Sequence, residues 1–297
     1  MSIVIAPKLK RIIFFITGLL AIVLILLGIL LFQQNKSRGV LEVDFLDVGQ
    51  GDSILIKTPQ GDDILIDGGP DASVLDGLGR NLPFYDRDIE LMILTHPHSD
   101  HVAGLVEVLK RYEVKKVLYT GALHTSPDYL EWLKIIKEKN IPMEIVKAGD
   151  RFQFGTSLYL DILYPFEELT NQKFKELNDS SIVSRLVYGQ TSFLLMGDAS
   201  VKIEEQLIKS ELSGQLKSDV LKVGHHGSHY SSSLEFLEVV KPDYAVIQVG
   251  EDNKFGHPHL GTLRKLENLG INIFRTDLDG EIKIKSDGNI LGVGSER

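Results

Sequence analysis

The sequence predicts one mixed α/β domain, with two sheets and helices outside them, preceded by a single membrane-spanning helix. Three observations support this prediction. An uncharged apolar stretch stands near the N-terminus, a strand-rich region follows it, and strands then alternate with amphipathic helices. Because 43% of the 297 residues are apolar, the chain can bury one sizeable core, and one domain over residues 41–297 is the economical interpretation.

Residues 12–32 form the first predicted element, a run of 21 residues without a charge. At a rise of about 1.5 Å per residue, this run spans roughly the 30 Å hydrocarbon layer of a membrane. The alternative is a cleaved signal peptide, whose apolar region is usually about 7–15 residues long and ends in small residues. This run ends in two leucines and a phenylalanine. We therefore expect an uncleaved transmembrane anchor, followed by a polar linker over residues 33–40.

The charges on either side of the anchor predict its orientation. Residues 1–11 form a short N-terminus that contains Lys8, Lys10 and Arg11, whereas Lys36 and Arg38 follow the anchor. Since the more basic flank usually stays in the cytoplasm, we expect a single-pass protein of the cell membrane. Its N-terminus would be cytoplasmic and its domain extracytoplasmic.

The charge and the lack of cysteine limit the chemistry of the domain. Of the 32 basic residues, five lie in residues 1–40, which leaves 27 against all 41 acidic residues. Such an acidic domain is unlike a general duplex-DNA binder, which needs a basic surface. Because the chain has no cysteine, disulfides, thiolate ligands and cysteine nucleophiles are excluded, and imidazole and carboxylate must hold any metal.

The domain begins with short, β-branched or leucine-rich runs bounded by turn residues, a pattern typical of strands. These runs cover residues 41–48, 53–58, 63–69 and 91–96. Val102, Leu105 and Leu109 then recur at helical spacing and predict a helix over residues 100–112. Further strands are expected at 114–121, 141–149, 158–165, 218–224, 243–250 and 280–288, a two-strand hairpin at 181–198, and helices at 127–140, 201–210, 233–240 and 260–270.

The strongest chemical signal is the pattern H-x-H-x-D-H, which directly follows the apolar strand "LMIL". In an extended chain His96 and His98 point the same way, so both can reach one ion. Asp100 and His101 begin the next helix and can face a second ion. Nitrogen and oxygen ligands without sulfur suit Zn²⁺, and also Mn²⁺ or Fe. The alternative, a histidine-rich surface loop, does not explain this spacing at the end of a buried strand.

This pattern resembles the signature of the metallo-β-lactamase superfamily, whose fold is a four-layer αββα sandwich with a metal site at one edge. Other segments follow in the family's order. Asp67 in "ILIDGG" resembles the aspartate that supports the ligands from behind, and Asp198 in "LLMGDA" resembles the carboxylate that bridges two ions. In "LKVGHHGS" either His225 or His226 resembles the late histidine ligand. The resemblance implies two divalent ions, Zn²⁺ or Mn²⁺, held by His96, His98, Asp100, His101, Asp198 and His225.

Over residues 41–285 the chain closely resembles the C-terminal hydrolase domain of ComEC-type DNA-uptake (competence) proteins, in segments such as "FLDVGQGDSILI" and "NDSSIVSRLVYG". The channel region of those proteins has no counterpart here. The resemblance implies a phosphodiesterase or nuclease that acts on single-stranded DNA or a small phosphodiester. Two alternatives stay open, because fold does not fix substrate. One is hydrolysis of a small ester, amide or lactam, and the other is a non-catalytic, metal-dependent binding module.

The chain departs from the wider superfamily in one respect. Between the H-x-H-x-D-H pattern and Asp198, most members supply another histidine, but this interval contains only His124, on a turn-like segment. The ComEC-like pattern implies that Asn178 or Ser181 substitutes. Because neutral oxygens bind Zn²⁺ more weakly than imidazole, the first site is expected to hold its ion loosely, to prefer a harder ion such as Mn²⁺, or to be empty until substrate arrives.

Several residues are expected to assist the ligands or the reaction. Asp100 is expected to orient the nucleophile or to shuttle its proton, and His257 in "FGHPH" to assist the leaving group. The "DVGQGD" segment either shapes a glycine-rich turn or orients a ligand histidine. The residues assigned to ligand support or substrate contact are Asp47, Gln50, Asp52, Asp67, Asn178, Ser181, His226, Ser228 and His259.

Overall fold

The computed structural model describes residues 7–36 and 39–297, and the chain divides into two compact units after Gly39. In the first unit, α1 (Pro7–Lys36) contains the whole predicted anchor and continues into the predicted linker. The large apolar side chains of residues 12–27 are exposed, and the helix is long and apolar enough to cross a membrane. Residues 1–6 of the predicted N-terminus and residues 37–38 of the predicted linker lie outside the described residues.

The second unit contains an eight-stranded sheet with the order β17-β16-β1-β2-β3-β5-β7-β8. Its strands are β1 (Leu41–Phe45), β2 (Ile54–Lys57), β3 (Asp63–Ile66), β5 (Leu91–Ile93), β7 (Val117–Tyr119), β8 (Met143–Ile145), β16 (Ile282–Ser286) and β17 (Leu291–Ser295). Strands β3, β5, β7 and β8 pair in parallel. Their carboxyl ends therefore lie at one edge of the sheet.

A seven-stranded sheet with the order β15-β14-β13-β12-β11-β10-β9 faces the first. Its strands are β9 (Arg151–Gln153), β10 (Leu158–Tyr164), β11 (Val183–Tyr188), β12 (Thr191–Leu195), β13 (Val220–Lys222), β14 (Tyr244–Ile247) and β15 (Asn272–Arg275). Strands β12 to β15 are parallel, so this sheet also gathers the carboxyl ends of four strands at one edge.

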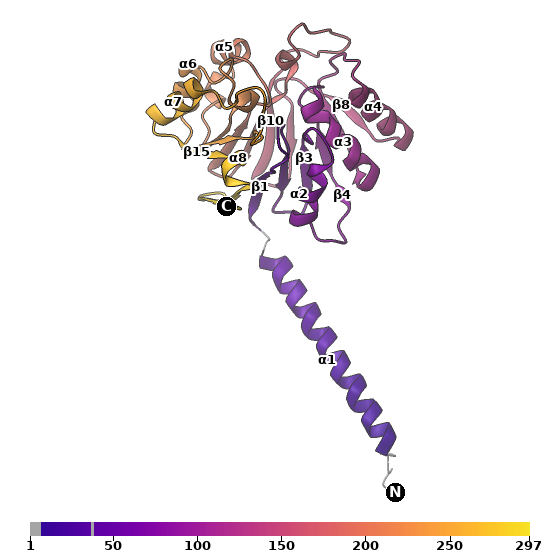
Figure 1. Ribbon diagram of the computed structural model, residues 1–297. Helices are drawn as coiled ribbons and strands as arrows, with labels where there is room; N and C mark the ends of the chain where they lie inside the picture. Colours follow the sequence, from indigo (N-terminus) through magenta and orange to yellow (C-terminus); the bar gives the residue numbers. More distant parts are fainter. Residues whose placement is uncertain (1–6, 37–38) are drawn as a thin grey trace. The chain divides into compact units, whose positions relative to one another are not determined.

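Helices cover the outer face of each sheet (Figure 1). On the first sheet lie α2 (Ser73–Asn81), α3 (Ser99–Arg111) and α4 (Pro127–Lys139), and on the second lie α5 (Val201–Lys209), α6 (Leu234–Val240) and α7 (Leu260–Asn268). One buried cluster fills the space between the sheets, and one lies under each helical layer. This is the predicted αββα sandwich, because each sheet buries both of its faces.

Some elements were not predicted, chiefly α2, β9, β15 and β17. Gly77 and Gly79 lie in α2, and Gly292 and Gly294 in β17. Glycine lowers both helix and strand propensity, so packing and pairing stabilise these elements rather than local preference. The remaining short elements are β4 (Asp88–Ile89), which pairs with β6 (Glu113–Val114), η1 (Leu177–Ser180), η2 (Ser213–Gln215), η3 (Gly224–Gly227) and α8 (Thr276–Asp279).

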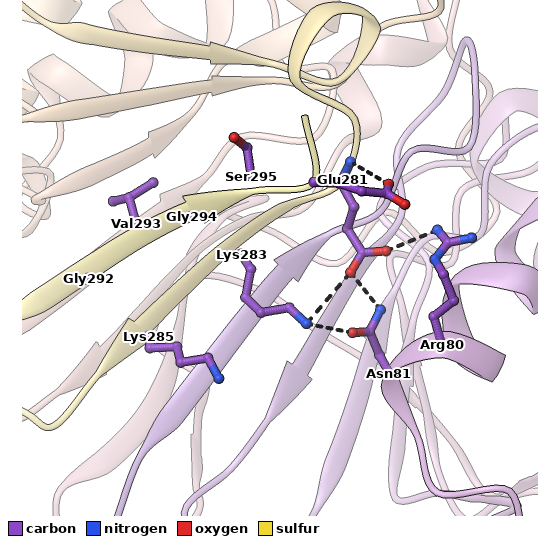
Figure 2. Close-up of a pocket in the computed structure, with 10 residues that line it drawn as sticks. Arg80, Asn81, Glu281, Lys283, Lys285, Gly292, Val293, Gly294 and Ser295 are labelled. Carbon is purple, nitrogen blue, oxygen red and sulfur yellow. Dashed lines mark hydrogen bonds and ion pairs between the residues drawn. The ribbon is translucent and has the colours of Figure 1, made fainter.

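A cavity of about 560 Å³ lies between the C-terminal end of α2 and strands β16 and β17 (Figure 2). Its polar groups bind one another. Glu281 accepts hydrogen bonds from Arg80 at 3.0 Å and from Asn81 at 2.6 Å, and Lys283 donates to Asn81 at 2.8 Å. None of the predicted metal ligands lines this cavity, so the chemical site lies elsewhere.

Candidate metal centre

The predicted ligands meet where the two sheets bring the carboxyl ends of their parallel strands to one edge. His96 follows β5, and Asp100 and His101 stand in the first turn of α3. Asp198 follows β12, and the tandem His225-His226 follows β13. These residues thus lie just after buried strands or at the start of the helix that follows one. The strands and the helix hold the backbone in place, so the side chains can face one another.

Four of these residues form a tight cluster: Asp100, His101, Asp198 and His226 offer donor atoms that all lie within 4.8 Å of one another. His226 Nε2 lies 3.3 Å from Asp100 Oδ2 and 3.5 Å from Asp198 Oδ2, and His101 Nε2 lies 3.4 Å from Asp198 Oδ1. Ligands about 2.0–2.1 Å from a tetrahedral Zn²⁺ stand roughly 3.3–3.4 Å apart. The spacing therefore fits a cation.

Unpaired polar atoms support the same conclusion. Within the described residues, His101 Nε2, His226 Nε2 and Asp198 Oδ1 are buried and make no hydrogen bond. Buried polar groups are nearly always satisfied, and each of these atoms points toward the others across the cluster. A divalent ion would satisfy all three at once.

Further imidazoles lie near Asp198 at longer distances. His96 Nε2 lies 2.9 Å from His98 Nδ1 and 3.9 Å from Asp198 Oδ2. His225 Nε2 lies 4.0 Å from the same carboxylate oxygen. Asp198 thus lies within 4.0 Å of the ring nitrogens of His96, His101, His225 and His226, as a carboxylate shared by two ions would.

The two adjacent histidines face different groups. We assigned His225 as the late ligand with His226 as the alternative, and the distances place His226 beside Asp100, His101 and Asp198, whereas His225 Nε2 lies 4.0 Å from Asp198 Oδ2. Both residues adopt left-handed backbone conformations, with φ of 49° and 53°. Their rings lie 6.1 Å apart at 67° to each other, so these neighbours in sequence have different surroundings.

Comparison with known proteins is consistent with this geometry. Residues 46–251 match the sequence model of the metallo-beta-lactamase superfamily. The chain belongs to this superfamily. Its relatives include "ComE operon protein 3" of Bacillus subtilis, 32% identical over 82% of this chain and 33% of that protein, and "Competence protein ComA" of Neisseria gonorrhoeae, 30% identical over 88% and 35%. These are ComEC-type proteins, and the chain spans about a third of their length.

Solved structures of low identity share the metallo-β-lactamase fold. The protein YhfI of Bacillus subtilis superposes with a TM-score of 0.53 at 12% identity, over 86% of this chain and 99% of YhfI. Zn²⁺-bound PqqB of Methylobacterium extorquens gives 0.51 at 12% identity, over 76% and 85%. At such identities the likeness concerns the fold alone.

Behind the cluster, Asp67 holds His101 as expected of this superfamily's supporting aspartate. It adopts a left-handed conformation, with φ of 57°. Its carboxylate accepts hydrogen bonds from Thr95 N at 2.8 Å, from Thr95 Oγ1 at 2.6 Å and from His101 Nδ1 at 2.7 Å. With Nδ1 engaged in this way, Nε2 of His101 is directed at Asp198.

The other supporting group includes a residue that was not predicted. His226 Nδ1 donates to the carbonyl of Gln248 at 2.9 Å and lies 3.3 Å from Asp52 Oδ1. The other oxygen of Asp52 forms an ion pair with Lys222. Lys222 ends the otherwise apolar strand β13. A lysine at the end of such a strand is the sequence signal that could have indicated a buried charge.

The remaining predicted residues divide by what they contact. Ser181 Oγ accepts from Asp198 N at 3.2 Å, and Asn178 Nδ2 lies 3.2 Å from the ring nitrogens of His225. Asp47 accepts from Gly49 N at 3.3 Å and shapes its own turn. Asn178 and Ser181 thus lie against the centre, whereas Asp47 has a structural contact.

The loops around the centre contain the other candidates. Gln50 Oε1 accepts from Gly250 N at 3.3 Å, which ties its turn to the loop before His257. The His257 ring lies 5.4 Å from that of His225. His259 is exposed and caps α7 by accepting from Gly261 N at 3.1 Å, and Ser228 Oγ accepts from Tyr230 N at 3.3 Å. His257 is therefore the loop histidine beside the metal centre.

Burial and charge together set the protonation of the centre. Burial lowers the pKa values of His96, His98 and His225, which leaves their nitrogens free to bind metal. For His226, burial acts in the same direction, but the negative charges of Asp198 and Asp52 have the larger effect. The net result is a pKa raised to about 10. Although burial opposes ionisation, His226 and His101 hold the pKa of Asp198 well below its usual range. The centre therefore offers ionised carboxylates whose charge a bound cation would neutralise.

Proposed function

We propose that the chain is a two-metal phosphodiesterase, and specifically a nuclease for single-stranded DNA. The observation that carries this proposal is the position of Asp198, whose Oδ1 lies 3.4 Å from His101 Nε2 and whose Oδ2 lies 3.5 Å from His226 Nε2, 3.9 Å from His96 Nε2 and 4.0 Å from His225 Nε2. One carboxylate between two imidazole groups is the arrangement expected of a pair of ions that share a water.

The proposed ligands follow from the two groups. His96, His98, His225 and Asp198 would hold the first ion, and Asp100, His101, His226 and Asp198 the second. Here His225 takes the place of the superfamily's intervening histidine, and Asn178 orients its ring. When bound, Zn²⁺ or Mn²⁺ lowers the pKa of a shared water toward about 7 and polarises the scissile phosphoryl oxygen.

Two residues have further roles in this proposal. The carboxylate of Asp100 is partly exposed beside the centre, so it can accept the proton of the attacking water. Burial, together with the neighbouring His225 and His226, lowers the pKa of His257 to about 4. His257 is therefore neutral at pH 7, and its role is to donate a neutral N–H hydrogen bond to the leaving or non-bridging oxygen.

The substrate class rests on several supports. Relatives bear the names of a competence protein and of "Recombination protein 2" of Haemophilus influenzae, which is 31% identical over 89% of this chain and 31% of that protein. The acidic composition of the domain disfavours tight binding to duplex DNA. A single strand, which an enzyme can hold through its bases as well as its phosphates, is favoured by the names of the relatives, whereas the acidic composition counts against it.

We also propose that α1 anchors the chain in the cell membrane, with the hydrolase domain outside the cytoplasm. The support is the exposed apolar side chains of residues 12–27 and the larger number of basic residues before the apolar run 12–32 (Lys8, Lys10 and Arg11) than in the linker after it (Lys36 and Arg38). The metal centre would then act on substrates at the outer surface of the membrane.

The test is hydrolysis by the full chain in detergent with Mn²⁺ or Zn²⁺. End-labelled single strands, duplexes and a bis-aryl phosphate form one panel, and a chromogenic lactam and a thioester form another. We expect cleavage of the single strands and its loss in His98→Ala, with the fold unchanged. His124→Ala is the matched control, because His124 belongs to neither proposed ligand set and, among the described residues, its ring hydrogen-bonds to nearby Ser126. Turnover confined to the second panel would refute the phosphodiesterase, and metal binding without any turnover would indicate a binding module.

A further inference from the structure

Lys222, the last residue of β13, is buried between the layers of the sandwich, with no exposed surface. Removing an ammonium group from water costs several kcal/mol unless other groups compensate for it. Its Nζ forms an ion pair with Asp52 and donates to the carbonyl of Gly197 at 3.1 Å. The fold alone does not require a charge here, because Val220, the other residue of β13 that faces the space between the sheets, is apolar.

Both contacts of Lys222 lead to the metal centre. Asp52, which is 2% exposed, directs its other oxygen at Nδ1 of His226, 3.3 Å away. Gly197 directly precedes Asp198 in the chain. One ammonium group therefore holds the carboxylate behind one ligand and the peptide beside another.

The side chain of Asp52 depends on this lysine. Its carboxylate also lies near the side chains of Asp67 and His101, whose ligand atoms are within 4.8 Å, but Lys222 is its ion-pair partner besides His226, and Oδ1 makes no hydrogen bond. The peptide groups of Asp52 bond to Asp100 O at 3.3 Å and to Gly69 N at 2.8 Å, which fixes its backbone but not its carboxylate. Without Lys222, an uncompensated buried carboxylate would have to move or reorganise.

We propose that Lys222 is a positioning residue of the metal centre. Its ammonium group fixes Asp52 and the Gly197 carbonyl, so that His226 and Asp198 direct their donor atoms at the same cation. The inference rests on the proposed metal site, but not on the substrate. Residues that orient metal ligands in this way typically change metal affinity by about 10–100-fold when replaced.

The experiment compares metal binding by the full chain in detergent, measured by calorimetry with Zn²⁺ and by the visible absorption of bound Co²⁺. Lys222→Met keeps the length of the side chain and removes its charge. We expect one of two bound equivalents to weaken about 10–100-fold and the Co²⁺ spectrum to change. Lys57→Met is the matched control, because Lys57 pairs with the buried Asp44 at 3.1 Å within the first sheet. That control should unfold at a lower temperature and bind metal as the unaltered chain does.

A double variant, Lys222→Met with Asp52→Asn, separates positioning from mere charge compensation and also serves if the single variant does not fold. It leaves no uncompensated charge, so its unfolding temperature should recover. Its weakened metal site should not recover, because His226 still lacks the ionised carboxylate. The proposal would be overturned if the double variant recovered both its unfolding temperature and its metal affinity. It would also be overturned if Lys222→Met had an unchanged Zn²⁺ affinity and Co²⁺ spectrum. Failure of the unaltered chain to cleave phosphodiesters would refute the proposed function alone, since these measurements do not involve turnover.

Discussion

The contact of α3 with the turn after β3 yields a sharp test, because it joins stability to the metal centre. The first turn of α3 carries Asp100 and His101, and the helix packs on Gly68 and Gly69. Gly68 N donates to His101 O at 2.8 Å, and Gly104 N donates to Gly69 O at 3.0 Å. The absence of a side chain at Gly104 permits this approach.

The expected change in the free energy of unfolding follows from two opposing effects of Gly104→Ala. In an exposed helix, alanine is more favourable than glycine by about 1 kcal/mol. Here the added Cβ would lie 1.8 Å from Gly68 O and 2.7 Å from Asp71 O. Both are backbone atoms that cannot rotate away. Overpacking of this kind costs about 3 kcal/mol at the upper end of its usual range. We expect a net loss of about 2 kcal/mol in the free energy of unfolding, or a fall of about 4–8 °C in Tm.

The assay is thermal unfolding followed by circular dichroism, with Zn²⁺ binding measured by calorimetry on the same samples. Gly79→Ala is the matched control, since Gly79 lies in α2 on the same sheet and its Cβ would meet nothing within 4 Å. That variant should gain about 0.5–1 kcal/mol and bind metal normally. Gly104→Ala should also bind Zn²⁺ more weakly, because a displaced helix moves Asp100 and His101. A Gly104→Ala protein as stable as the unaltered chain, with unchanged metal affinity, would refute this reasoning.

Three further predictions concern the metal centre, pH and topology. Asp67→Asn should weaken metal binding about 10–100-fold by calorimetry, because a neutral amide holds the ring of His101 poorly; equal affinity would contradict this. Burial and neighbouring carboxylates raise the pKa of Asp63 to about 7, so the stability it contributes is present below about pH 4 and lost as the pH rises through 7. Asp63→Asn should therefore raise the urea midpoint at pH 8 more than at pH 5, and equal shifts would argue against the raised pKa. Because the chain has no cysteine, an impermeant maleimide applied to intact cells should label Asn289→Cys and not Ser2→Cys; the reverse pattern would invert the proposed topology.

Several features were predictable from the sequence because they depend on local periodicity. Short apolar runs bounded by turn residues predicted most strands, and the 3.6-residue spacing of Val102, Leu105 and Leu109 predicted α3. The H-x-H-x-D-H pattern predicted a site at the end of β5, because a strand end and a helix start place His96 and Asp100 on neighbouring elements. A glycine-rich helix and edge strand, α2 and β17, carry weak local signals, so only their packing and pairing reveal them.

The tertiary structure alone decided which candidate donors lie together. His225 and His226 are adjacent and chemically identical, and only their left-handed backbone and the packing of Asp52 and Gln248 direct His226 at the tight cluster. Lys222 acquires a role only because another sheet brings Asp52 against it. Residue type and spacing determine what chemistry this chain can perform, whereas ring orientation and charge compensation depend on contacts between residues far apart in the sequence. No local pattern encodes those contacts.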